Sequence, residues 1–202
     1  MNDDIATFIF FLAVIDPVGT VPVFLAVTRG YEGQIKRRIA VRAALISASI
    51  LMFFVVAGEP ILTAMDIPLS AFQIAGGIVL FLFALTMIFG ESKPEEEVKM
   101  ATSGNETAVF PLAVPSIASP GAMLAAVLLT ENARFNLWEQ AQTSAIMLSV
   151  ILLALGLMLA ASWVHRLIGD SGASIISRVM GLILASVAVS SVLSGIKEYF
   201  EL

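Results

Sequence analysis

Residues 11–19 read FLAVIDPVG, and residues 114–121 read VPSIASPG. Each stretch places a polar residue directly before a proline, in the middle of a long apolar run. Asp16 takes this place in the first stretch and Ser119 in the second. Proline inside a helix removes an amide donor and clashes with the carbonyl group four residues earlier. Both runs are therefore predicted to be broken helices.

Long apolar runs also dominate the rest of the chain. Of its 202 residues, 58% are hydrophobic and 13% are charged, and the mean hydropathy is +0.95. A run of about 20 apolar residues has the length that crosses the hydrocarbon layer of a bilayer. The hydropathy predicts six spans, at residues 5–27, 39–57, 71–89, 109–130, 141–164 and 175–196. We expect an all-α integral membrane protein.

The second half of the chain repeats the first. Gly181 follows Gly77, and Ala188 follows Ala84, by 104 residues, while the two polar residues before proline are 103 residues apart. Two matches at nearly the same offset indicate a duplication. Because each copy has three spans, the second copy enters the membrane from the opposite face, which gives two inverted three-helix repeats. We expect repeat one at residues 1–90, a linker at 91–107 and repeat two at 108–202.

The positive charges predict the orientation in the membrane. Nine Lys and Arg residues lie in or beside the first, third and fifth loops, whereas only Arg134 and Lys197 lie on the other side. Cytoplasmic loops carry this excess, so both termini are expected to face away from the cytoplasm. The start of the chain is acidic and lacks the basic region of a signal peptide, so we expect the first apolar run to be retained.

Several classes of function conflict with the composition. The chain has no cysteine, and His165 is its one histidine, so we expect neither a metal nor a cofactor. The chain has no basic arm that would predict nucleic acid as a partner. Asp16 is the one acidic residue well inside a span, which leaves no carboxylate pair for an aspartyl protease. His165 lies at the wrong depth to activate a serine. We expect no enzyme.

The two breaks form the candidate site. Paired broken helices in inverted repeats are typical of secondary transporters. Freed amides can bind a carboxylate and freed carbonyls an ammonium group, so a zwitterionic amino acid suits both. The alternative is that the prolines only kink the helices and shape the bundle. The candidate substrate-binding residues are Asp16, Pro17, Gly19, Thr20, Ser116, Ser119, Pro120 and Gly121.

Asp16 is the sharpest single candidate, because a carboxylate at the membrane midplane is costly. Three roles stay open: capping the half-helix after the break, coupling to a proton or Na⁺, and direct contact with substrate. The equivalent Ser119 is also a good helix cap, which favours capping. Near the site, Gly76, Gly77 and Gly181 are expected to let helix backbones approach closely.

Four segments resemble the MarC family (UPF0056) of bacterial inner-membrane proteins. Residues 16–24 (DPVGTVPVF) resemble its DPxGxxPxF signature, and residues 72–78 resemble its AGGI segment. Residues 111–122 are similar to its PLAxPxxxGPGA segment, and residues 178–184 to its last helix. The segments follow in order and cover nearly the whole chain. Ser119 departs from the glycine that is usual in the family, so substrate assignments carry over less safely.

The resemblance implies a six-span fold related to the LysE amino-acid exporter superfamily. It implies a bacterial inner-membrane protein that transports small neutral amino acids, such as glycine or alanine. The paired breaks indicate alternating access, and the division of Lys and Arg predicts that both termini are periplasmic. A proton or Na⁺ is the expected coupling partner, and an oligomer is left open. The alternatives are a channel and a non-transporting membrane protein involved in stress or drug response.

Overall fold

The computed structural model describes residues 2–89, 112–132 and 134–200, which form two sets of helices. The first set is α1 (Asn2–Ile15), α2 (Thr20–Val27), α3 (Gly33–Ala64) and α4 (Leu69–Phe89). The second set is the short π-helical η1 (Leu112–Ile117), α7 (Pro120–Leu128), α8 (Leu137–Leu159) and α9 (Ala161–Tyr199). No strand occurs in these ranges, as expected. The predicted linker at 91–107 and Pro111 lie outside the described residues.

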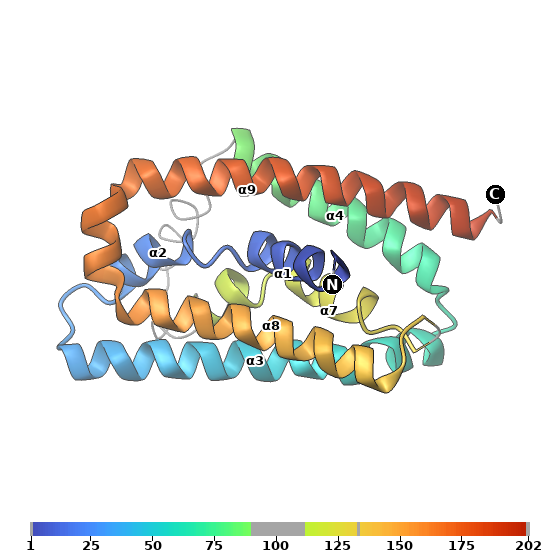
Figure 1. Ribbon diagram of the computed structural model, residues 1–202, viewed down its shortest axis with the longest axis horizontal. Helices are drawn as coiled ribbons and strands as arrows, with labels where there is room; N and C mark the ends of the chain where they lie inside the picture. The colour runs from blue at the N-terminus through green and yellow to red at the C-terminus, as the bar shows by residue number, and fades with distance from the viewer. Residues whose placement is uncertain (1, 90–111, 133, 201–202) are drawn as a thin grey trace.

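The helices form three layers (Figure 1). The broken pairs α1–α2 and η1–α7 make the central layer, α3 and α8 cover one side of it, and α4 and α9 cover the other. Within each layer the two repeats run in opposite directions. The protein therefore has the two inverted three-helix repeats that the sequence predicts.

Two glycine contacts between α4 and α9 show the two-fold relation in detail. A Cβ atom placed on Gly77 would lie 3.1 Å from the carbonyl oxygen of Ala188, and one placed on Gly181 would lie 3.2 Å from that of Ala84. Gly181 and Ala188 are the repeat equivalents of Gly77 and Ala84. The same close contact is thus made twice in reciprocal form, as a two-fold axis requires.

Five helical stretches are long and apolar enough to cross a membrane: residues 4–27, 33–64, 69–89, 137–159 and 171–199. The sixth segment is η1–α7, which lies beside α1–α2 in the central layer. Two helices extend further than expected. Helix α3 exceeds the predicted 39–57 at both ends, and α9 begins with a segment of mixed polar and apolar residues, 161–168, before Gly169 (φ 64°, ψ 178°) turns the chain into the long membrane helix.

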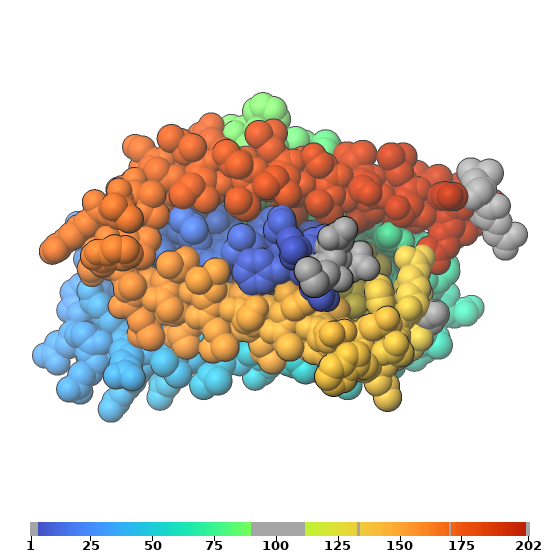
Figure 2. Space-filling model, in the orientation of Figure 1, coloured from blue at the N-terminus to red at the C-terminus, as the bar shows by residue number. Residues whose placement is uncertain are grey.

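The core of the protein is the central layer. Phe11, Ile15, Leu112 and Ile117 are fully buried there. The outer helices instead expose large apolar side chains along their length, a surface that suits lipid. Figure 2 shows one opening in this cover, where α1 reaches the surface between α8 and α9.

Candidate functional site

The first break is built around Asp16. Its amide donates the last bond of α1, to the carbonyl oxygen of Leu12 at 3.0 Å. Asp16 then takes a left-handed conformation (φ 47°), which is uncommon for residues other than glycine but is tolerated by aspartate. The next residue, Pro17, is buried and has no amide hydrogen. These two residues end α1 in the middle of the membrane segment.

The carboxylate of Asp16 is 1% exposed and is held by two neutral donors. Oδ1 accepts the backbone amide of Gly19 at 3.0 Å, and Oδ2 accepts the hydroxyl of Ser177 at 2.7 Å. The first bond closes the break before α2. The second bond ties the break to α9, which belongs to the other repeat. Asp16 therefore accepts an amide in the turn before α2 and also links the first break to α9.

Ser119 has the equivalent place in the second break and also makes two bonds. Its Oγ accepts the amide of Ala122 at 3.2 Å, which caps α7, and donates to the carbonyl oxygen of Val14 at 2.8 Å. Val14 lies in the last turn of α1. One hydroxyl group thus joins the end of α1 to the start of α7. Glycine at this position could not make these bonds.

Further hydroxyl groups link the two breaks and their surroundings. The Oγ1 atom of Thr20 lies 3.2 Å from the Oγ atom of Ser116, and both side chains are fully buried. Ser47 of α3 donates to the carbonyl oxygen of Ala113 at 3.2 Å. The two breaks therefore meet in one buried polar region.

Small residues leave this region no spare room. A Cβ atom on Gly19 would lie 2.1 Å from Oδ2 of Asp16, and one on Gly121 would lie 2.5 Å from Cδ1 of Leu80. One on Gly76 would lie 2.2 Å from Cδ1 of Leu124, which belongs to α7. The predicted substrate-binding residues are buried except for Pro120, whose side chain is exposed at the first position of α7.

Ser177 was not predicted, although the sequence contains a signal for it. Ser177, Gly181, Leu184 and Ala188 are spaced by four, three and four residues, and all four are buried. This spacing places them on one face of a helix. What the spacing cannot tell is that Asp16 faces the first of them.

Two cavities lie on either side of the breaks along the first span. One, of about 530 Å³, is lined by Thr7 and Phe10 of α1, and also by residues of α4, α7 and α9. The other, of about 440 Å³, is lined by Phe24 and Leu25 of α2 and by Lys36 and Arg37 of α3. The first break, at residues 16–19, separates these two sets of lining residues.

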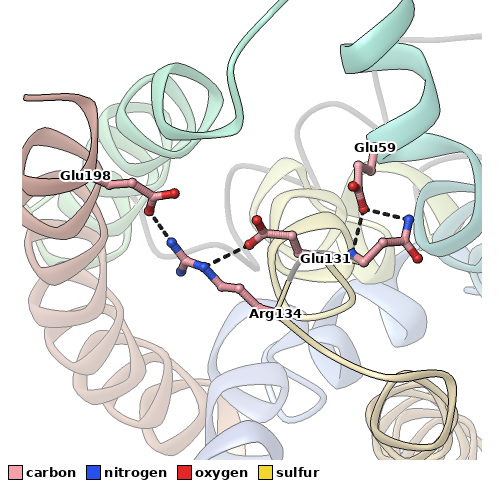
Figure 3. A network of polar contacts seen from close by, with 5 residues as sticks. Glu59, Glu131, Arg134 and Glu198 are labelled. Carbon is pink, nitrogen blue, oxygen red and sulfur yellow. Dashed lines mark hydrogen bonds and ion pairs between the residues drawn. The ribbon is translucent and has the colours of Figure 1, made fainter. Parts of the chain in front are cut away.

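Arg134, which lines the larger cavity, belongs to a network of polar contacts (Figure 3). Arg134 pairs with Glu131 (Nε to Oε2, 3.0 Å) and, through Nη2, with Glu198 at the end of α9. Glu59 of α3 accepts both the amide and the side chain of Asn132, at 2.7 and 2.8 Å. The network joins three elements that are distant in sequence.

Glu131 is the buried member of this network, with 6% of its surface exposed. Burial raises the pKa of its carboxyl group above the ordinary 4.5; Arg134 opposes this, whereas Glu198 and Glu59 add to it. A raised pKa means that folding favours the protonated form. This contribution to stability is fully present below pH 4.5 and is lost as the pH rises through the raised pKa.

Glu131→Gln is therefore expected to raise the melting temperature of the detergent-solubilised protein at about pH 8 and to change it little at about pH 4. Glutamine stays neutral, so the difference between variant and parent should grow with pH. The exposed Glu32→Gln serves as the control. A lower melting temperature for Glu131→Gln at the higher pH would mean that the Arg134 pair outweighs the cost of burial.

Metal ligands do not gather anywhere in the part of the chain that the structure describes: no group of three His, Cys, Asp or Glu residues could hold a metal ion there. The site consists of one carboxylate, several hydroxyl groups and the backbone of two broken helices. Together with the apolar outer layers, it defines an integral membrane protein made of inverted repeats with a polar centre.

This protein belongs to the MarC family, since the model of the "MarC family integral membrane protein" matches residues 1–200. It is 32% identical to a UPF0056 membrane protein of Buchnera aphidicola and 31% identical to the UPF0056 inner membrane protein YhgN of Escherichia coli, in each case over the whole of both chains. It is 34% identical to a UPF0056 membrane protein of Methanocaldococcus jannaschii, over 96% of this chain and 95% of the relative. No solved structure matches the chain significantly.

Proposed function

We propose that this protein is a secondary transporter that moves a small neutral amino acid, such as glycine or alanine, by alternating access. The observation that carries the proposal is the meeting of two helix breaks in one buried polar region, with Asp16 in one break and Ser119 in the other. Inverted repeats with paired broken helices are the architecture of many secondary transporters. The two cavities would serve as entrances from opposite sides of the membrane.

The chemistry of the breaks suits a small zwitterion. The carboxylate of Asp16 can attract an ammonium group, and the amides at the start of α7 carry the partial positive charge that a carboxylate needs. The tight packing around Gly121 favours a substrate without a large side chain. In this proposal Asp16 is also the group that binds a coupling proton or Na⁺.

We further propose that the protein lies in a bacterial inner membrane with both termini in the periplasm. The name of the Escherichia coli relative supports the membrane, and the nine-to-two division of Lys and Arg supports the orientation. In this orientation, the pair of Arg134 and Glu198 faces the periplasm. The cavity that Lys36 and Arg37 line faces the cytoplasm.

Gly121→Leu tests the location of the substrate. We expect the detergent-purified protein to bind glycine or alanine with saturable heat in calorimetry, and the variant to bind at least about tenfold more weakly, a loss of about 1.4 kcal/mol. The leucine side chain would clash with Leu80, whose Cδ1 lies 2.5 Å from a Cβ atom on Gly121, and would shift the packing beside the break. Gly156→Leu is the matched control, because a Cβ atom there meets nothing within 4 Å.

Three outcomes would contradict parts of this proposal: its substrate class, its binding site and its mechanism as a carrier. No heat with glycine, alanine, serine or threonine would count against small neutral amino acids as substrates. Equal affinity of the Gly121→Leu variant and the parent would place binding away from the breaks. Ohmic currents across planar bilayers, without saturation, would instead identify a channel.

A further inference from the structure

The cavity of about 530 Å³ has the composition of a ligand-binding pocket rather than of a plain entrance. Its volume falls within the roughly 300–1,000 Å³ of small-molecule sites, which are largely apolar with a few placed polar groups. Its apolar walls include Phe10, Leu128 and Phe135. Arg134 is the one charged residue among the described residues that line it.

Arg134 is held in place while part of its guanidinium group stays available. Nε pairs with Glu131 and Nη2 with Glu198. The ion pairs among the described residues do not use Nη1, and the side chain is 46% exposed. A guanidinium group fixed in this way is preorganised, and its Nη1 can donate to a carboxylate.

The surroundings of Arg134 also favour an ammonium group. The carboxylates of Glu131 and Glu198 hold Arg134 from outside the cavity, since neither of them lines it (Figure 3). Gln73 and Ser191 line the same cavity and offer neutral acceptors. A ligand that bears both a carboxylate and an ammonium group therefore matches this end of the cavity better than a simple anion does.

We propose that this cavity binds an α-amino acid with a large apolar side chain, its carboxylate on Arg134, its ammonium group near Gln73 and Ser191, and its side chain against Phe10, Leu128 and Phe135. This second site goes beyond the proposed transport of small amino acids. It does not depend on binding at the breaks, because none of the residues of the two breaks lines it.

Calorimetry of the purified full-length protein with L-leucine tests the site. We expect saturable binding by the parent protein, at least about tenfold weaker binding by Arg134→Gln, and partial recovery in Arg134→Lys. Leucinol, which lacks the carboxylate, and 4-methylpentanoate, which lacks the ammonium group, should both bind more weakly than leucine. Arg178→Gln, which changes an exposed arginine outside this cavity, should bind leucine as the parent does.

Gln73→Leu provides a second variant, since it leaves the Arg134 network intact but removes an acceptor from the cavity. It should weaken leucine binding several-fold without lowering the melting temperature. Gly121→Leu should bind leucine as the parent does even where it loses glycine, which separates this site from the one at the breaks. Absence of saturable leucine binding, or Arg134→Gln binding with the affinity of the parent, would overturn the proposal.

Discussion

Gly19→Ala is expected to lower the melting temperature of the detergent-solubilised protein by about 10 °C, the largest stability effect of any single methyl group in the site. The added Cβ atom would lie 2.1 Å from Oδ2 of Asp16 and 2.7 Å from Oγ of Ser177. Overpacking of this kind costs about 1–3 kcal/mol, and a lost hydrogen bond to a charged group about 1.5–3 kcal/mol. For a chain of this length each kcal/mol corresponds to about 2–4 °C.

Gly156→Ala is the control for this prediction, because a methyl group on that residue meets nothing within 4 Å. It should leave the melting temperature nearly unchanged or raise it slightly, since alanine is the better helix former. An equal melting temperature for Gly19→Ala and the parent protein would show that the Asp16 carboxylate does not sit against Gly19 and Ser177 as described.

Asp16→Asn is expected to keep the fold and to lower the rate of amino-acid uptake into proteoliposomes by at least about tenfold. The asparagine carbonyl oxygen can still accept the amide of Gly19, and its NH₂ group can donate to Ser177, whose hydroxyl can reverse its role. Only the negative charge is removed. Because hydrogen bonds to a charged group are worth about 1.5–3 kcal/mol, the loss of a charge that holds an ammonium group or coupling cation corresponds to about ten- to a hundredfold in rate.

The matching control is Ser177→Ala, which keeps the charge and removes the bond to α9. If this variant loses stability while Asp16→Asn loses uptake, the two functions of the carboxylate, connecting and coupling, are separated. Uptake by Asp16→Asn at the parental rate across the pH range would exclude Asp16 from coupling and leave it as a cap.

The sequence predicted the central architecture because that architecture depends on backbone chemistry. A proline donates no amide hydrogen and disfavours a helical conformation in the residue before it, so Asp16-Pro17 and Ser119-Pro120 located the breaks to within a residue or two. The offset between Gly77 and Gly181 indicated the duplication, and an odd number of spans made it inverted. The reciprocal contacts of these glycines with Ala188 and Ala84 follow the same repeat.

What escaped prediction depends on which distant segments meet. Ser177 lies 161 residues from Asp16 along the chain, and nothing in the local pattern states that they are partners. Likewise, no local pattern indicates that Glu59 meets Asn132 or that Glu198 meets Arg134. Helix α9 begins well before its predicted span because residues 161–168 form a further helical segment, which Gly169 separates from the long membrane helix.

The two breaks differ in length, so the two-fold relation between the repeats is only approximate at the centre of the protein. Four residues separate α1 from α2, whereas only two separate η1 from α7, so the two halves of one chain currently hold different shapes. Exchanging those shapes between the halves would generate the same assembly turned upside down relative to the bilayer. The residues at equivalent places in the two breaks also differ, with Asp16 opposite Ser119, so the two halves share an architecture without sharing the same local structure.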